Sequence, residues 1–177
     1  VALAGGLESI SLVQNDHWNG HRYQDPNVAA EYYLSMVATA EIVAERYGVS
    51  RDTQDLYALQ SQMRTASAQQ AGLFEDEIIP VEATKLSTDK NTGVIDEERV
   101  RIPGDECNRP GTTLEGLSGL KPVLGPDKCV TAGNASQLSD GASASVLMEA
   151  KEATRRGLEP LGIFRGFAVA GCDSEEM

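Results

Sequence analysis

The sequence has 177 residues, with 15 Lys or Arg against 27 Asp or Glu, which gives a formal charge of −12. This length fits one domain of ordinary size, and a content of 41% hydrophobic residues is enough for a core. The acidic excess argues against nucleic acid as a partner, although a few local Arg or Lys could still hold a small anionic ligand. No apolar run reaches the roughly 18 residues of a membrane span, and no signal peptide is expected.

The first part of the chain predicts a strand followed by a helix. Residues 1–4 are predicted to end a buried strand, with a tight exit at Gly5–Gly6. Residues 12–27 are polar and predict a loop. Apolar residues three and four positions apart then predict a helix over residues 28–47, and Gly48 suits its C-terminal cap.

A second helix is predicted from the N-cap Ser50 to about Ala71. Its first turn carries an acidic residue, which the positive end of the helix dipole favours, and Gly72 stops the pattern. Four residues form an apolar stripe that is expected to face the core, namely Leu56, Leu59, Met63 and Ala66.

The middle of the chain is polar and acidic. Residues 77–81 predict a short edge strand, and Asn91–Gly93 predicts a hairpin between Thr84–Ser87 and Val94–Asp96. Residues 75–106 hold ten acidic and four basic side chains, which is half of the total net charge. We interpret this stretch as a solvated surface, because its acidic residues do not have the spacing of a calcium loop.

The last part of the chain returns to an alternating pattern. Thr113 can cap a short helix over residues 114–120, and a small-residue segment follows at 131–141. A buried strand over 142–148, a helix over 149–156 and a strand over 161–170 are then predicted. Strand, helix and strand at this spacing are typical of the α/β class.

Cysteine and histidine residues offer little chemistry. Cys107, Cys129 and Cys172 are an odd number without CxxC spacing, which argues against a disulfide framework and a zinc site, so reduced thiols and a cytoplasmic location are expected. None of the three is favoured as a nucleophile. His17 and His21 lie four residues apart but in a polar loop, so no metal site is expected there.

Several segments, taken in order, resemble the thiolase family. Residues 4–11, Ala-Gly-Gly-Leu-Glu-Ser-Ile-Ser, resemble its AGGxESMS segment, and residues 131–142 resemble its TAGNASxxxDGA segment. Between them, Met36–Glu41 resembles the MGxTAE helix start and Ser50–Asp55 the SRxxQD cap, while residues 72–78 also look thiolase-like. The resemblance covers essentially the whole chain.

This resemblance implies an α/β chain that is an internal part of the layered αβαβα thiolase fold, with an inserted, largely helical loop domain that covers coenzyme A. Residues 1–11 would end a core strand of the N-terminal half, and residues 12–130 would form the loop domain. Residues 131–158 would return to the N-terminal core, and residues 159–177 would begin the C-terminal half.

The implied activity is that of an acyltransferase in fatty acid metabolism. A thiolase exchanges acyl groups between coenzyme A and a 3-ketoacyl-CoA through a cysteine thioester. The family's nucleophilic Cys would lie upstream of Val1, and its catalytic His, Asn and second Cys downstream of Met177. The chain alone is therefore expected to be inactive, with acyl-CoA as substrate, no tightly bound cofactor, and a homodimer or homotetramer as the complete protein.

The resemblance assigns coenzyme A contacts, and no catalytic or metal-binding residue, to this chain. Arg109 matches the residue at the adenosine-phosphate end, and Ser136 matches the residue that hydrogen-bonds the pantetheine arm. The remaining matches are wall residues of the same site: Ala132 and Leu138 beside the pantetheine, Leu120 and Leu124 near the adenine, and Met36 near the acyl end. Ser35 stands where short-chain biosynthetic thiolases carry His, which puts an acetoacetyl-CoA preference in doubt.

Two alternatives stay open on the sequence alone. The chain could belong to a non-catalytic thiolase-like protein that binds acyl-CoA or lipid. It could also be an independent acidic interaction module, which would fold cooperatively by itself and ignore coenzyme A.

Overall fold

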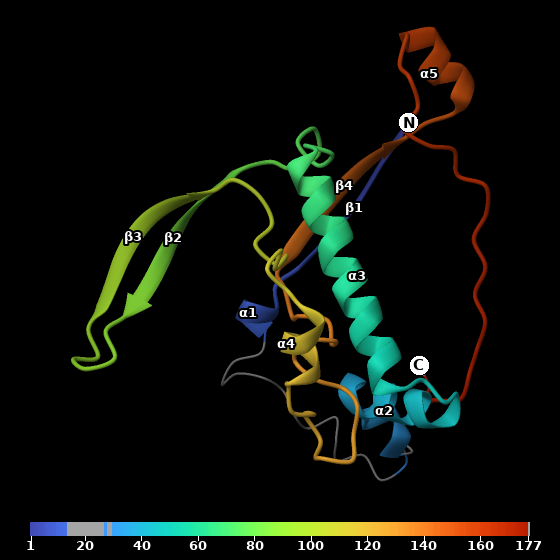
Figure 1. Ribbon diagram of the computed structural model, residues 1–177. Helices are drawn as coiled ribbons and strands as arrows, with labels where there is room; N and C mark the ends of the chain where they lie inside the picture. The colour runs from blue at the N-terminus through green and yellow to red at the C-terminus, as the bar shows by residue number, and fades with distance from the viewer. Residues whose placement is uncertain (14–26, 28–29, 177) are drawn as a thin grey trace. The chain divides into compact units, whose positions relative to one another are not determined.

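The computed structural model describes residues 1–13, 27 and 30–176 (Figure 1). The chain divides into two compact units, and each is considered by itself here. Unit 1 comprises residues 1–47 and 136–177, and unit 2 comprises residues 48–135. The division into four sequence-predicted domains stays a prediction.

Unit 1 contains a two-stranded antiparallel ribbon. Strand β1 (Ala2–Glu8) pairs with β4 (Gly141–Leu147), so that residues far apart in the sequence lie side by side. A strand close to the one expected over 142–148 is thus present, but β1 and β4 are exposed along their whole length, so the burial predicted for both is wrong. The expected exit at Gly5–Gly6 is also wrong, because β1 runs straight through both glycines. A Cβ on Gly5 would lie 2.6 Å from the Ser143 carbonyl oxygen, so the missing side chain permits close pairing rather than a turn.

Among the helices of unit 1, α2 begins at a clear side-chain cap. A four-residue helix α1 (Ile10–Val13) follows β1, and a 3₁₀ turn η2 (Ala30–Tyr33) precedes α2 (Met36–Arg46). The predicted helix over 28–47 therefore starts later than expected, because Ser35 is extended and its Oγ accepts the Ala38 N–H at 3.2 Å. Gly48, with φ of 64°, follows the C-terminal end of α2 as predicted.

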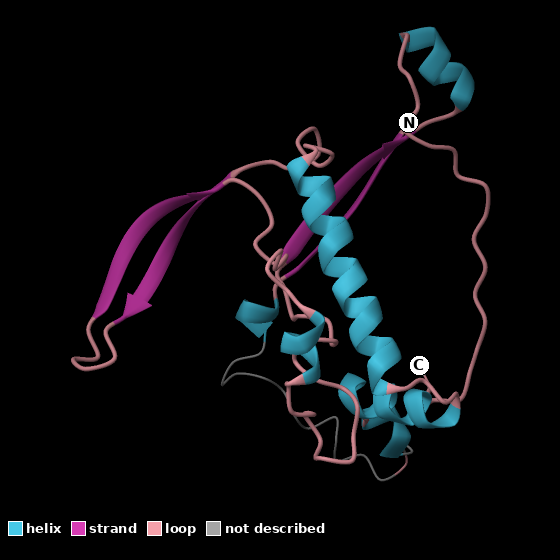
Figure 2. Cartoon of the chain, viewed as in Figure 1, coloured by secondary structure: helices cyan, strands magenta, loops and turns pink. Residues whose placement is uncertain are grey.

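The C-terminal part of unit 1 is only partly regular. The predicted helix is α5 (Ala150–Arg156), which ends at Gly157 with φ of 67°. The strand expected over 161–170 is wrong: the structure has no strand there, and Figure 2 shows the stretch as loop. A strand needs a hydrogen-bonding neighbour, and no described residues pair with this stretch. Farther along, Arg46 and Tyr47 hold Glu176, and Arg46 also pairs with Glu175.

Unit 2 is built around the long helix α3 (Arg51–Gln70). Ser50 caps it as predicted, since its Oγ accepts the Thr53 N–H at 3.2 Å, and Gly72 follows its end with φ of 70°. Helix α4 (Leu114–Ser118) packs against α3, and its cap is the predicted Thr113, which accepts the Gly116 N–H at 3.1 Å.

The apolar stripe predicted on α3 is only partly the face that the structure buries. Ala66 of this stripe is buried, but Leu56 and Met63 are more than half exposed. The other buried residue of α3 is Asp55, which hydrogen-bonds the surrounding loops and which an apolar periodicity cannot indicate.

A hairpin completes unit 2. Strands β2 (Val81–Thr88) and β3 (Ile95–Ile102) pair antiparallel from Val81 opposite Ile102 to Thr88 opposite Ile95. The predicted hairpin is confirmed and is longer than expected. The separate strand expected over 77–81 is wrong, because turn hydrogen bonds from Glu77 and Ile78 to the Phe74 carbonyl continue past α3.

Candidate functional site

One stripe of α3 fixes the loops of unit 2. Arg51, Asp55 and Gln62 lie at positions i, i+4 and i+11 of the helix, so they share a face. Each of them hydrogen-bonds a residue in a segment of the chain at least 46 positions away. Four of the seven predicted ligand residues (Arg109, Leu120, Leu124 and Ala132) belong to this unit.

Arg51 and Asp55 form an ion pair at the start of this stripe. The Arg51 Nε lies 2.7 Å from Asp55 Oδ2, and the Asp55 side chain is only 1% exposed. The Arg51 Nη2 donates to the carbonyl oxygens of Leu117 at 2.6 Å and Leu120 at 3.2 Å. The guanidinium therefore satisfies the carbonyl groups at the C-terminal end of α4 and fixes the backbone of the predicted wall residue Leu120.

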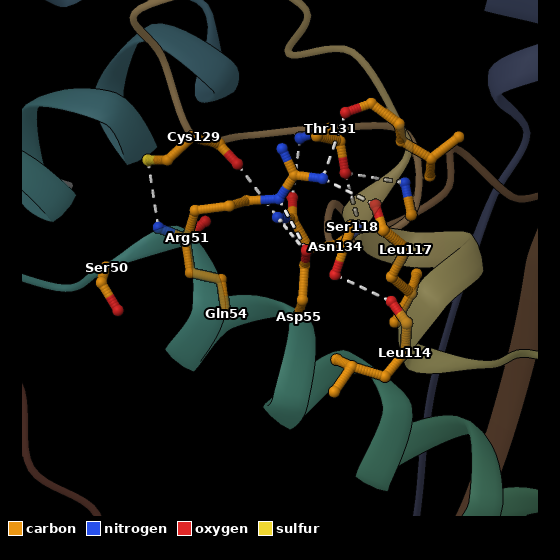
Figure 3. Close-up of polar contacts among 12 residues, drawn as sticks. Ser50, Arg51, Gln54, Asp55, Leu114, Leu117, Ser118, Cys129, Thr131 and Asn134 are labelled. Carbon is orange, nitrogen blue, oxygen red and sulfur yellow. Dashed lines mark hydrogen bonds and ion pairs between the residues drawn. The ribbon is translucent and has the colours of Figure 1, made fainter.

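Asn134 connects the same carboxylate to the small-residue segment (Figure 3). Its Nδ2 donates to Asp55 Oδ1 and to the Cys129 carbonyl, both at 3.0 Å, and its Oδ1 accepts the Thr131 N–H at 2.7 Å. Thr131 is fully buried, and its Oγ1 accepts the N–H groups of Gly133 and Asn134. These bonds close residues 129–134 into a turn in which Ala132 is exposed.

Gly133 brings this turn against α4. A Cβ at this position would lie 2.5 Å from Leu120 Cδ1 and 2.6 Å from Leu117 Cδ2. Any larger residue would therefore force these two leucine side chains to shift, whereas the sequence indicated only a preference for small residues.

Arg109 is positioned through its backbone. Its N–H donates to Gln62 Oε1 at 2.8 Å, and the neighbouring Asn108 Nδ2 donates to the same oxygen at 2.8 Å. The Arg109 carbonyl accepts the Thr112 hydroxyl at 2.7 Å. Because the residue is exposed while its backbone is tied to α3, the guanidinium is available to an anion.

The other three predicted ligand residues, Met36, Ser136 and Leu138, belong to unit 1. Met36 lines a hollow of about 290 Å³ together with Tyr32, Leu34 and Cys172, among others. Leu138 is 71% exposed, and Ser136 is exposed with its Oγ donating to the Gln137 carbonyl. Ser35, at whose position some members of the resembled family carry His, is the N-cap residue of α2. The assignment of all seven residues stays a prediction.

Residues 4–11 meet the end of the 131–142 segment in unit 1, and both segments carry the family resemblance. Besides the ribbon of β1 and β4, Asp140 accepts the Ser11 N–H and the Ser9 hydroxyl, each at 3.0 Å. The Ser11 N–H, followed by the hydroxyls, lowers the pKa of the Asp140 carboxyl. Asp140 thereby holds the start of α1 beside the start of β4.

Metal and membrane chemistry find no support in the described part of the chain. No three His, Cys, Asp or Glu side chains gather there as metal ligands, and His17 and His21 lie outside the described residues. Among the described helices, none is long and apolar enough to cross a bilayer.

Comparison with known proteins identifies the family. A family model described as "Thiolase, N-terminal domain" matches residues 1–151. This chain belongs to the thiolase family. The 3-ketoacyl-CoA thiolase of Bacillus subtilis (strain 168) is 45% identical over 181 residues, which is 99% of this chain and 45% of that protein. The human peroxisomal 3-ketoacyl-CoA thiolase is 40% identical over 179 residues, which is 100% of this chain and 41% of that protein.

A solved thiolase confirms the α/β fold class. The crystal structure of human mitochondrial 3-ketoacyl-CoA thiolase in complex with CoA is similar with a TM-score of 0.65 and 33% sequence identity. The match covers 90% of this chain and 40% of that one. This thiolase-family chain thus spans less than half the length of the relatives that it matches.

The sequence did not reveal the α3 stripe that anchors the unit 2 segments. Arg51 and Asp55 are four residues apart, a spacing at which ion pairs on helices are common. The sequence pattern of residues 50–55 predicted only a helix cap. The role of Gln62 has no local signal, because its partners lie 46 and 47 residues away.

Proposed function

We propose that this chain is a section of a thiolase-family acyltransferase that exchanges acyl groups between coenzyme A and 3-ketoacyl-CoA. The observation that carries this proposal is the match of 3-ketoacyl-CoA thiolases along 99% or more of the chain. The solved relative was crystallised with CoA, which supports CoA as the ligand.

The proposed reaction runs through a thioester on a cysteine outside this chain. A thiolate attacks the keto carbon of the 3-ketoacyl-CoA, the adjacent carbon–carbon bond breaks, and protonation of the released carbanion yields acetyl-CoA. The thiol of a second coenzyme A then loses its proton to a base and takes the acyl group from the cysteine. Cys107 and Cys172 are exposed in this chain, and neither is in a disulfide.

In this reaction the chain's contribution is to bind coenzyme A. The exposed guanidinium of Arg109 would pair with a phosphate of the adenosine end, where a planar, charged fork is the favoured donor. Ser136 would hydrogen-bond the pantetheine arm. Leu120, Leu124, Ala132, Leu138 and Met36 would supply the walls, four of them being exposed large apolar side chains.

Isothermal titration of the full-length protein with coenzyme A tests this proposal, together with an assay of 3-ketoacyl-CoA cleavage. We expect Arg109→Ala to raise Kd for coenzyme A about tenfold or more, because a hydrogen bond to a charged group is lost. Arg99→Ala is the matched control, since it removes an exposed arginine from the hairpin of the same unit.

The outcomes separate the site from the function. Unchanged affinity in Arg109→Ala would disprove the Arg109 assignment alone. A wild-type protein that binds coenzyme A without cleaving 3-ketoacyl-CoA would contradict the acyltransferase and support a non-catalytic acyl-CoA-binding protein.

We further propose that the full-length protein is a cytoplasmic homodimer or homotetramer. Cys107 and Cys172 are exposed and not in a disulfide, which is compatible with a reducing compartment, although the relatives include peroxisomal forms. Light scattering after size exclusion tests the oligomeric state, and cell fractionation tests the location. A monomer, or recovery in an organelle fraction, would contradict the respective part.

A further inference from the structure

The buried polar residues of unit 2 converge on one turn. Asp55 and Thr131, at 1% and 0% exposure, are the most buried side chains among the described residues, and both contact Asn134. Both Asp55 oxygens are occupied, Oδ2 by Arg51 and Oδ1 by Asn134. The network of Arg51, Asp55 and Asn134 is therefore fully connected around its buried charge.

Such a network is a costly way to gain stability. A buried ion pair gives back in attraction roughly what its charges lose in hydration, and apolar residues of the same volume often stabilise as well or better. What the charged and amide groups supply is direction, because each hydrogen bond fixes an angle as well as a distance. The network therefore fixes a backbone shape more than it adds stability.

The backbone that the network shapes is the turn at 129–134. One amide, that of Asn134, holds the Cys129 carbonyl and the Thr131 N–H, which lie on either side of the bend. Thr131 is thereby buried while the next residue, Ala132, is exposed. Gly133 then seats the turn on Leu117 and Leu120 of the α4 region, whose carbonyls Arg51 holds. Two predicted wall residues, Ala132 and Leu120, thus depend on one ion pair.

We infer that Arg51, Asp55 and Asn134 are positioning residues that set the shape of the 129–134 turn and thereby the affinity for coenzyme A. This inference rests on the proposed function. The proposed action is through the backbone, by holding Ala132 and Leu120 where a ligand wall needs them.

The test uses one substitution that keeps the size of the side chain and one that keeps its charge. Asn134→Asp keeps the shape of the side chain but removes both donated hydrogen bonds and places a second carboxylate against Asp55. Arg51→Lys keeps the charge but cannot span the Asp55 carboxylate and two carbonyls as the guanidinium does. Matched controls are Asn91→Asp at the exposed hairpin tip and Arg64→Lys on the exposed side of α3.

Affinity is measured in the full-length protein at a temperature where circular dichroism shows every variant folded. We expect Kd for coenzyme A to rise about tenfold in Asn134→Asp and in Arg51→Lys, the size of one lost charged hydrogen bond. KM for coenzyme A should rise in parallel while kcat stays within about twofold, because uniform binding and not the chemical step is altered. The two controls should match wild type.

Two results would overturn the inference or its basis, and they are distinguishable. Folded variants with unchanged Kd but lower melting temperatures would show that the network is only structural. Should Asn134→Asp not fold, the same measurement on Arg51→Lys decides. A wild-type protein that does not bind coenzyme A at all would disprove the proposed function itself.

Discussion

At the scale of single residues, Gly133 shows how closely the small-residue segment is packed. Its Cα faces the methyl groups of Leu117 and Leu120, and Leu117 is only 4% exposed, so it has little room to move. Overpacking at such a position forces side chains away from their preferred rotamers.

We therefore predict that Gly133→Ala lowers the free energy of unfolding of the full-length protein by about 1–3 kcal/mol. Chemical denaturation measures this difference. Gly111→Ala is the control, because an added Cβ there meets nothing within 4 Å. Equal stability of the two variants would show that the turn can move away from α4.

Asp140 gives a second residue-scale prediction, which concerns pH. The pKa of its carboxyl is lowered by the Ser11 N–H, so its contribution to stability is present above the ordinary pKa of about 3.9 and is lost as the pH falls through the lower folded value. Asp140→Ala should be less stable than wild type at neutral pH. The gap should close below about pH 4.

Denaturation of both proteins over a pH series tests the Asp140 prediction. A gap that does not change with pH would show that the charge of Asp140 is unimportant. Asp127→Ala, which removes an exposed acid, serves as the control for a general loss of negative charge.

At the scale of elements, helix α3 is the scaffold of unit 2, and its start depends on one hydroxyl. Ser50 Oγ accepts the Thr53 N–H, which otherwise has no partner within the helix. We predict that Ser50→Ala destabilises the helix by about 1 kcal/mol.

Hydrogen exchange of the α3 amides measures the effect of the lost cap. The first turn should exchange faster in Ser50→Ala, whereas Ser67→Ala, an exposed substitution within the same helix, should leave exchange there unchanged or slower. If the two variants behave alike, the cap does not limit opening of the helix.

The elements also show what the sequence could predict. Helix caps depend on local sequence. Helices begin after Ser50 and Thr113 and one ends at Gly157, as the chemistry of these residues indicates. Strands are less local, because a strand exists only through its neighbour. Residues 161–170 have a strand's composition, yet their large apolar side chains (Leu161, Ile163, Phe164, Phe167 and Val169) are exposed.

The candidate site likewise has one part that the sequence could predict and one part that it could not. The small-residue segment at 131–141 and Arg109 could be singled out by composition and by family resemblance. The supporting residues could not, since Asp55 and Asn134 are 79 positions apart and nothing in either neighbourhood refers to the other. The polar residues Arg51, Asp55 and Gln62 share one face of α3, but that periodicity does not indicate which distant residues they bind.

At the scale of the whole molecule, the chain buries little apolar surface. Its accessible surface is 14,859 Å², whereas two separate compact units that shared its mass equally would together expose about 10,000 Å². Among the described residues, the buried hydrophobic side chains are few and mostly small: Ala44, Ala66, Leu117, Val130 and Ala153. A stable core needs more burial than this.

We predict that the 177-residue chain by itself shows no sharp thermal unfolding transition and binds the dye ANS. Circular dichroism and dye fluorescence test this, with the full-length protein as the cooperative reference. A single sharp transition in the isolated chain would instead favour an independent acidic module.

The hairpin of unit 2 has a practical consequence. The segment that follows β3 is held to α3, where Gln69 contacts the Asp105 carbonyl and Gln62 contacts Asn108, while the strands extend away from that helix (Figure 1). The tip at Asn91–Gly93 is exposed and is closed by its own turn, in which Asp89 accepts two N–H groups. Extra residues inserted there would lengthen the loop without disturbing the contacts that Gln69 and Gln62 make. The tip is therefore a place for a fluorescent or affinity label with which binding by the intact protein can be followed.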